Sequence, residues 1–339
     1  MLRAGYPRST LRLVPAQAGT VPTGVLVPLV TPFAADGSVA LDALESLAHD
    51  VLDDGASGLV ALGTTAEPAS LTADEQRDVL DVTCRVAGDR GATLLVGAST
   101  TDALDALRGR TAVAAALTLV PPFVRAGEAG AVAHLTVLAA ASPVPVVVYH
   151  VPHRTGQELG GDALRRLARV DGIVGVKLST AADPAAVALL GDLPDGFDVL
   201  AGDDAVLAPM LALGASGGVL ASAHLGTAAF VRLVDAWAAP RVDLATARDL
   251  GARLARLSAA CFAEPNPAVV KGVLHARGRI PTPSVRLPLL PASTASVDAA
   301  LAALDAVEAD PVGAGGAVDA GAADRALGTP GGRRAHGAP

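Results

Sequence analysis

The chain has 339 residues, a formal net charge of −8 at pH 7 and a pI near 5.3. An acidic chain with 2% aromatic residues is unsuited to nucleic acid or an anionic membrane surface, because those partners require basic or stacking side chains. Cys84 and Cys261 are isolated and the seven histidines are scattered, which indicates a reducing cytoplasm and no structural metal site.

Hydrophobic periodicity and turn residues predict eight strand-then-helix units in chain order. The strands are predicted over 24–30, 58–62, 93–97, 115–120, 144–149, 173–177, 197–201 and 217–221. The helices are predicted over 41–54, 72–87, 102–109, 129–141, 161–170, 184–190, 205–213 and 227–238. Thr72 and Glu75 form a capping-box signature at the second helix.

This repeat, at a spacing of roughly 25 residues, predicts an α/β fold of the (β/α)8 TIM-barrel class with additional C-terminal helices. An open doubly wound sheet is the alternative. The first strand is not followed by Gly-x-Gly-x-x-Gly, and this absence disfavours a dinucleotide-binding sheet.

The predicted organisation has four parts. They are a flexible tail over 1–20, the barrel over 21–239, a helical segment over 240–309 and a disordered tail over 310–339. The first of these lacks the continuous apolar core of a secretory signal. Residues 205–231 carry no charge apart from His224, but Pro209 and several glycines interrupt them. They therefore predict a buried helix, a turn and a strand rather than a membrane span, and we expect a soluble protein.

Lys177 closes a short apolar strand. A lysine in this position is either ion-paired or used as an amine, because burial favours its neutral and nucleophilic form. The chain contains only two lysines, Lys177 and Lys271, and uses arginine elsewhere, although arginine cannot form an imine. The pattern indicates that Lys177 forms a Schiff base, with a structural ion pair as the alternative. Lys271 lies within the helical pattern 267–277 after the barrel, so we expect its stem to pack and its amine to cap or pair.

Other polar residues follow the predicted strands, where the active sites of such barrels lie. Thr64 and Thr65 follow the second strand, Tyr149 ends the fifth and Asp203 follows the seventh. Tyr149 could transfer protons, with a core tyrosine as the alternative. The two threonines and their amides could hold a carboxylate, with an ordinary turn as the alternative.

Five motifs stand in a fixed order along the chain. They are Gly-Thr-Thr-Ala-Glu at 63–67, Tyr-His-Val-Pro-His-Arg-Thr-Gly at 149–156, Gly-Val-Lys at 175–177, Gly-Asp-Asp at 202–204 and Asn-Pro-Ala-Val-Val-Lys at 266–271. In these motifs, and over roughly 23–290, the chain resembles the dihydrodipicolinate synthase/N-acetylneuraminate lyase family of class I aldolases. The resemblance implies a cytoplasmic Schiff-base-forming lyase that acts on pyruvate or a related 2-oxo acid plus an aldehyde and needs no cofactor. Because family members are commonly tetramers built from tight dimers, we expect a homo-oligomer, either a tetramer or a dimer.

The resemblance also implies roles for single residues. It assigns catalysis to Lys177, Tyr149 and Thr65, and substrate binding to Thr64, Thr65, Arg154 and the backbone near Val219. Lys177 would form the Schiff base and Tyr149 would shuttle protons. Arg154 matches the arginine that grips the carboxylate of the second substrate, with a structural ion pair as the alternative.

Three positions depart from the family pattern. Phe123 replaces a second tyrosine that is donated across the tight-dimer interface, and we expect it in the site beside Tyr149. Ala66 replaces a glycine and His150 an asparagine. Synthesis of a lysine precursor is therefore supported by Arg154 and opposed by Phe123. The alternatives are a retro-aldolase or dehydratase of a 2-oxo-3-deoxy acid or specialised metabolite, and a non-catalytic binding or regulatory paralogue, against which Lys177 argues.

Overall fold

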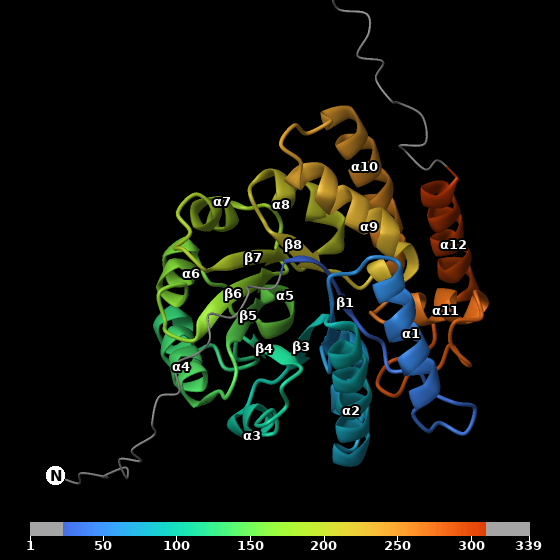
Figure 1. Cartoon of the computed structure of the whole chain (residues 1–339), viewed down its shortest axis with the longest axis horizontal. Coiled ribbons are helices and arrows are strands. Elements are labelled where there is room, and N and C mark those ends of the chain that lie inside the picture. Colours follow the sequence, from blue (N-terminus) through green and yellow to red (C-terminus); the bar gives the residue numbers. More distant parts are fainter. Residues whose placement is uncertain (1–22, 310–339) are drawn as a thin grey trace, which may run out of the picture.

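In the computed structural model, which describes residues 23–309, eight parallel strands close into a barrel (Figure 1). The strands are β1 (Gly24–Pro28), β2 (Gly58–Ala61), β3 (Thr93–Gly97), β4 (Val113–Leu119), β5 (Val146–His150), β6 (Ile173–Leu178), β7 (Asp198–Ala201) and β8 (Gly217–Val219). Each strand pairs with the next, and Leu26 of β1 lies beside Val219 of β8 to close the ring. The predicted (β/α)8 class is confirmed, whereas the tails predicted over 1–20 and 310–339 lie outside the described residues.

Helices alternate with the strands and cover the outside of the barrel (Figure 1). They are α1 (Leu41–Asp53), α2 (Ala73–Arg90), α3 (Thr101–Asp105), α4 (Gly127–Ala141), α5 (Pro152–Thr155), α6 (Gly161–Leu167), α7 (Pro184–Leu190), α8 (Leu207–Ala212), α9 (Ala223–Ala238), α10 (Leu244–Cys261), α11 (Ala268–Ala276) and α12 (Thr294–Glu308). Three 3-10 turns are η1 (Thr64–Ala66), η2 (Pro68–Ser70) and η3 (Asp204–Val206). The last three helices pack on one another and on α9. Across the described part of the chain, no helix is long and apolar enough to span a membrane.

Several element ends differ from the prediction. The first strand was predicted over 24–30 but ends at Pro28. The Leu29 amide still donates to the Val60 carbonyl of β2 at 3.0 Å, whereas the Val30 amide donates to His224 Nε2 at 3.2 Å. Helix α3 ends at Asp105 rather than at residue 109. Helix α5 was not predicted, since a single turn beginning at Pro152 is too short to show periodicity.

The buried apolar side chains form two layers. One fills the inside of the barrel, and the other lies between the strands and the surrounding helices. The inner layer contains Leu26, Val60, Leu95, Ala115, Leu117, Val147, Tyr149, Val151, Leu200 and Val219. Alternate residues of the same strands, such as Val146 and Val148, pack outward against the helices. Successive side chains of a strand point to opposite faces, so Tyr149 points inward. Its register partner on β6 is Lys177, and both side chains therefore lie at the same height near the C-terminal rim.

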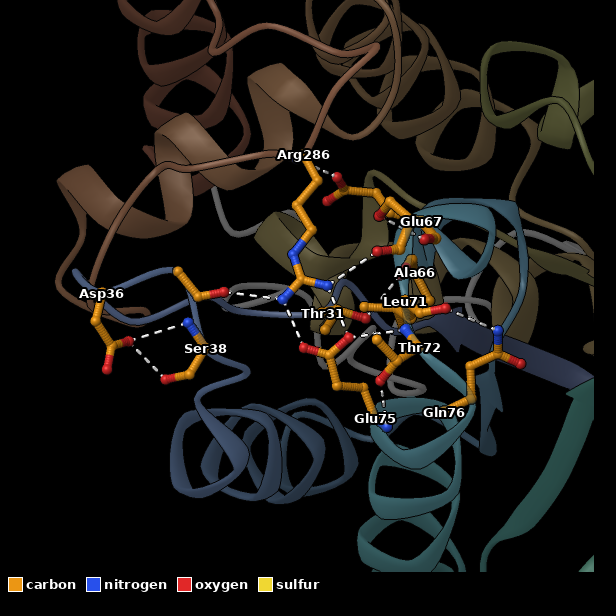
Figure 2. A network of polar contacts seen from close by, with 12 residues as sticks. Thr31, Asp36, Ser38, Ala66, Glu67, Leu71, Thr72, Glu75, Gln76 and Arg286 are labelled. Carbon is orange, nitrogen blue, oxygen red and sulfur yellow. Dashed lines mark hydrogen bonds and ion pairs between the residues drawn. The ribbon is translucent and has the colours of Figure 1, made fainter.

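The segment after α11 crosses back over the loops that follow β1 and β2 (Figure 2). Thr282 Oγ1 donates to the carbonyl of Phe33 at 2.7 Å. The Arg286 guanidinium donates to both carboxylate oxygens of Glu75 at 2.6 and 2.8 Å, and it holds the pKa of that carboxyl down at about 2. Glu75 also accepts the Thr72 amide, so the predicted capping box is confirmed. The end of the fold is thus tied to its beginning.

We expect Gly97→Ala to lower the free energy of unfolding by roughly 1–3 kcal/mol, the usual range for overpacking. A Cβ atom at Gly97 would lie 2.2 Å from the carbonyl oxygen of Leu62 and would displace the loop after β2. Urea denaturation measures the loss. Gly88→Ala inside α2 is the control, because its nearest neighbour would be 4.0 Å away and alanine favours a helix. Unchanged stability of the Gly97 variant would contradict the close approach.

Candidate active site

A cavity of about 220 Å³ opens at the C-terminal rim of the barrel, a size suited to a small organic molecule. It brings together all the residues assigned to the site from the sequence, namely Thr64, Thr65, Tyr149, Arg154, Lys177 and Val219, together with Asp203. Its other lining residues are Pro28, His153, Ser179, Gly202, Asp204, Ala221, Phe262 and Asn266.

Lys177 points from β6 into this cavity and is 6% exposed. Its Nζ lies 4.1 Å from the centroid of the Tyr149 ring, within range of a cation–π attraction. Among residues 23–309 this amine has neither an ion-pair nor a hydrogen-bond partner. The structural ion pair considered for Lys177 is therefore not found, and the amine faces the space where a substrate would sit.

Gly202 leaves room for the lysine side chain. A Cβ atom at Gly202 would lie 2.6 Å from Lys177 Cε and 2.4 Å from Ser179 Oγ. Ser179 instead donates its hydroxyl to the Gly202 carbonyl at 2.7 Å. Ser179 was not predicted as a site residue, although strand alternation places it on the same face as Lys177, two residues further along.

Lys271 occupies the opposite kind of environment. It is fully buried, and its Nζ donates to Glu67 Oε1 at 2.9 Å and to the Thr31 carbonyl at 2.8 Å. The amine also lies 4.1 Å from the centroid of the Phe33 ring. Burial lowers the pKa of the Lys271 amine, while the charge and hydrogen bond of Glu67 oppose this shift. The packing and pairing predicted for Lys271 are confirmed.

Tyr149 is 7% exposed and lies among polar groups. Burial opposes ionisation of its phenol. The charge of Lys177, hydrogen bonding to Ser179 and the charge of Arg154 outweigh this effect, so the pKa of Tyr149 lies below its ordinary value. A phenol with a lowered pKa gives up its proton more readily, which suits a group that transfers protons.

Thr64 and Thr65 project from the 3-10 turn η1 at the rim. Thr65 Oγ1 accepts a hydrogen bond from Asn266 Nδ2 at 3.0 Å, which orients the threonine hydroxyl. Asn266 belongs to one of the five motifs but was not predicted as a site residue. It lies after the barrel, so it does not follow any barrel strand. Its Oδ1 is buried without a hydrogen-bond partner in the described part of the chain.

Two adjacent carboxyl groups follow β7. Asp203 Oδ1 caps η3 by accepting the Ala205 amide at 3.1 Å. Asp204 is 2% exposed and accepts the Ser222 amide at 2.6 Å. Burial raises the pKa of Asp204 to about 6, although hydrogen bonds from Ser222 and the charge of Lys177 oppose the shift. Asp203 was predicted from the sequence, but the more deeply buried carboxyl of the pair is that of Asp204.

Arg154 lies on α5 at the mouth of the cavity, beside His153. It is exposed, and within residues 23–309 it makes no ion pair. The structural ion pair considered for Arg154 is therefore absent from this part of the chain. Its guanidinium remains available to an anion at the cavity mouth.

Phe123 does not lie beside Tyr149 within this chain. The family resemblance placed it in the site across a dimer interface, and that placement stays a prediction. Its side chain is 90% exposed and does not line the cavity. The backbone explains the outward direction, because Phe123 has a left-handed φ of 65° and its amide donates to the Thr155 carbonyl at 3.2 Å.

The other two departures from the family pattern leave the cavity unaltered. His150 follows Tyr149 and so occupies the opposite face of β5, where burial lowers its pKa to about 4 and keeps the ring neutral at pH 7. Ala66 is not among the residues with positive φ, so its position does not require glycine.

Comparison with known proteins gives consistent matches. The profile of the dihydrodipicolinate synthetase family matches residues 21–307. A 4-hydroxy-tetrahydrodipicolinate synthase of Neisseria gonorrhoeae is 33% identical over 273 residues, covering 79% of this chain and 92% of the relative. The synthase of Synechococcus elongatus is 35% identical over 275 residues, covering 79% of this chain and 91% of the relative.

A solved structure is similar in the same way. The chloride-inhibited dihydrodipicolinate synthase of Acinetobacter baumannii, complexed with pyruvate, superposes with a TM-score of 0.78 at 31% identity. The match covers 84% of this chain and 99% of that one. The predicted resemblance is thereby confirmed, and the chain belongs to the dihydrodipicolinate synthetase family, whose members are pyruvate-dependent, Schiff-base-forming lyases.

Proposed function

We propose that this chain joins pyruvate to an aldehyde through a Schiff base on Lys177, in the manner of a 4-hydroxy-tetrahydrodipicolinate synthase. The observation that carries the proposal is the environment of the Lys177 amine. It is buried at the inner wall of the barrel, lies over the Tyr149 ring, and has no carboxylate partner among the described residues. An amine held in this way can attack a carbonyl carbon.

The proposed reaction proceeds through an iminium and an enamine. The neutral Lys177 amine attacks the keto carbon of pyruvate, and loss of water leaves the iminium. Removal of a methyl proton gives the enamine, whose carbon attacks the aldehyde and forms the new carbon–carbon bond. Water then releases the product and restores the amine. Tyr149 is proposed to carry protons in these steps, which its lowered pKa supports.

Substrate binding is proposed to use both sides of the cavity. Thr64 and Thr65 would hold the pyruvate carboxylate, with the Thr65 hydroxyl oriented by Asn266. The backbone near Val219, which lines the same cavity, would also seat the substrate. Arg154 would bind a carboxylate on the aldehyde, and its exposed position at the mouth supports this role.

Relatives of this chain are named 4-hydroxy-tetrahydrodipicolinate synthases. On the family resemblance we propose aspartate semialdehyde as the aldehyde. A retro-aldolase or dehydratase acting on a 2-oxo-3-deoxy acid is the second candidate. Phe123 favours it, because phenylalanine lacks the hydroxyl expected of the second tyrosine in a lysine-precursor synthase. A non-catalytic binding role would not explain why the buried Lys177 amine lines the cavity without a carboxylate partner among the described residues.

We also propose that the protein is a cytoplasmic homo-oligomer, either a tetramer or a dimer. Phe123 and Val124 are 90% and 65% exposed, and such apolar side chains support contact with another copy of the chain. Cys84 and Cys261 are free thiols, which is consistent with a reducing compartment.

We expect borohydride to trap pyruvate on Lys177, and peptide mass mapping locates the adduct. Lys177→Arg should abolish trapping because a guanidinium forms no imine under these conditions. Lys271→Met should retain trapping at saturating pyruvate. An adduct on Lys271, or no adduct on the wild type, would refute the assignment.

We expect the Tyr149 phenol to titrate below its ordinary pKa of about 10. The chain has two tyrosines, so a Tyr6→Phe background isolates the tyrosinate absorbance of Tyr149. Adding Lys177→Met should raise the pKa of Tyr149, because it removes a positive charge that favours the phenolate. A pKa at or above the ordinary value in the Tyr6→Phe protein would contradict the effect of this charge.

We expect the wild type to be a slow synthase with aspartate semialdehyde and Phe123→Tyr to be faster. Because Phe123 points away from its own cavity, the restored hydroxyl would act in the cavity of a neighbouring copy. A general acid–base group there typically contributes about 10²–10⁴-fold. Steady-state rates of both proteins measure the gain. If the wild type already matches a dedicated synthase, the second tyrosine is dispensable and Phe123 no longer supports the second candidate.

A further inference from the structure

The turn that carries Thr64 and Thr65 has an unfavourable backbone on both sides. Leu62, just before it, has a φ of 52°, and Glu67, just after it, has a φ of 56°. Left-handed backbone is uncommon outside glycine, and it persists only where neighbouring contacts enforce it. The turn therefore requires tertiary contacts to keep this shape.

Glu67 supplies the strongest of these contacts. One carboxylate oxygen accepts the Lys271 amine at 2.9 Å, and the other accepts the Arg286 backbone amide at 2.8 Å. The side chains of Glu67 and Lys271 are 2% and 0% exposed. Charge-assisted hydrogen bonds of this kind, away from water, hold a side chain in one geometry.

Contacts of Thr31 connect Lys271 to the turn itself. The Thr31 hydroxyl donates to the Ala66 carbonyl at 2.8 Å, and the Thr31 carbonyl accepts the same Lys271 amine. Figure 2 shows Thr31, Ala66 and Glu67 beside the Arg286 side chain, which spans to Glu75 on the neighbouring helix. Lys271 thus holds both Glu67 and Thr31, and Thr31 in turn bonds the Ala66 carbonyl of the turn.

A purely stabilising role explains this pair poorly. A buried ion pair is weak evidence for stability, because well-packed apolar residues of similar volume often serve as well. The pair is found at the strained end of the turn that lines the cavity. Hydrogen bonds to Glu67 fix the direction of its side chain and of the backbone that precedes it. An apolar contact has no such directionality.

We propose that the buried Glu67–Lys271 pair is a positioning element that sets the Thr64–Thr65 turn for the pyruvate carboxylate. Neither residue lines the cavity, so the pair acts through the backbone of the turn and the contacts of Thr31. The proposal rests on the proposed function of Lys177 and of the two threonines.

The test uses borohydride trapping of pyruvate on Lys177 in the full-length protein, as a function of pyruvate concentration. Glu67→Gln and Lys271→Met should each raise the half-saturating pyruvate concentration about 10-fold or more, because small misplacements in a site have effects up to about 10²-fold. Trapping at saturating pyruvate should remain. Both variants should also unfold at lower temperature, since each leaves an unpaired charge buried.

The double variant Glu67→Gln/Lys271→Met separates positioning from stability. It removes both charges, so the melting temperature should recover in part. The half-saturating concentration should nevertheless stay raised, because the side chain at position 67 no longer has the Lys271 amine to fix its direction. Recovery of both quantities together would overturn the proposal.

Leu135→Ala on α4 is the matched control. Leu135 is fully buried and remote from the turn, so truncation lowers the melting temperature through a cavity alone. Its half-saturating concentration should equal that of the wild type. An equal rise in this control would show that any loss of stability weakens binding, and the proposal would fail.

Two further outcomes are decisive. If the pair variants do not fold, Thr31→Val tests the same positioning more mildly by removing the donor to the Ala66 carbonyl. A several-fold rise in half-saturating pyruvate supports the proposal, and an unchanged value overturns it. If the wild type itself traps no pyruvate, the function proposed for Lys177 fails, whereas trapping with unchanged half-saturation in every folded variant refutes only the positioning role.

Discussion

Side chains alternate along every strand of a closed barrel, so only one face of β5 and of β6 reaches the cavity. Tyr149 and Lys177 are register partners on these strands, which places a phenol and an amine at one height inside the rim. The closeness of the amine to the ring and the lowered pKa of the phenol both depend on this pairing. A shift by one residue would turn one of the two side chains outward among the helices.

The two lysines show how burial alone leaves function undecided. Both amines are removed from bulk water and both lie 4.1 Å from an aromatic ring centroid. Lys271 has a carboxylate and a carbonyl as partners, whereas the amine of Lys177 faces a cavity. The two amines therefore differ in their hydrogen-bond partners rather than in their burial. The paired amine holds a loop, and the unpaired amine is open to a carbonyl substrate.

Much of this arrangement was predictable from the sequence. The repeat of strands and helices gave the barrel, and residues at strand ends gave Thr64, Thr65, Tyr149 and Lys177, because closure brings those ends to one rim. Ser179 was within reach of the same reasoning. Asn266 was not, since it comes from a loop beyond the barrel, and no local pattern says which rim residue such a loop meets. The resemblance placed Phe123 at a dimer interface, but sequence could not show its left-handed backbone, because that conformation has no sequence signature at phenylalanine.

The route of the C-terminal segment has a consequence for the order in which the protein takes shape during synthesis. Thr65 meets Asn266 across 201 residues of sequence, and Glu67 meets Lys271 and the Arg286 amide across 204 and 219 residues. A ribosome must make nearly the whole described chain before these partners exist. The strands of the first half can pair early, but the rim that faces the substrate acquires its final shape among the last events of folding, when distant segments of the chain close on one another.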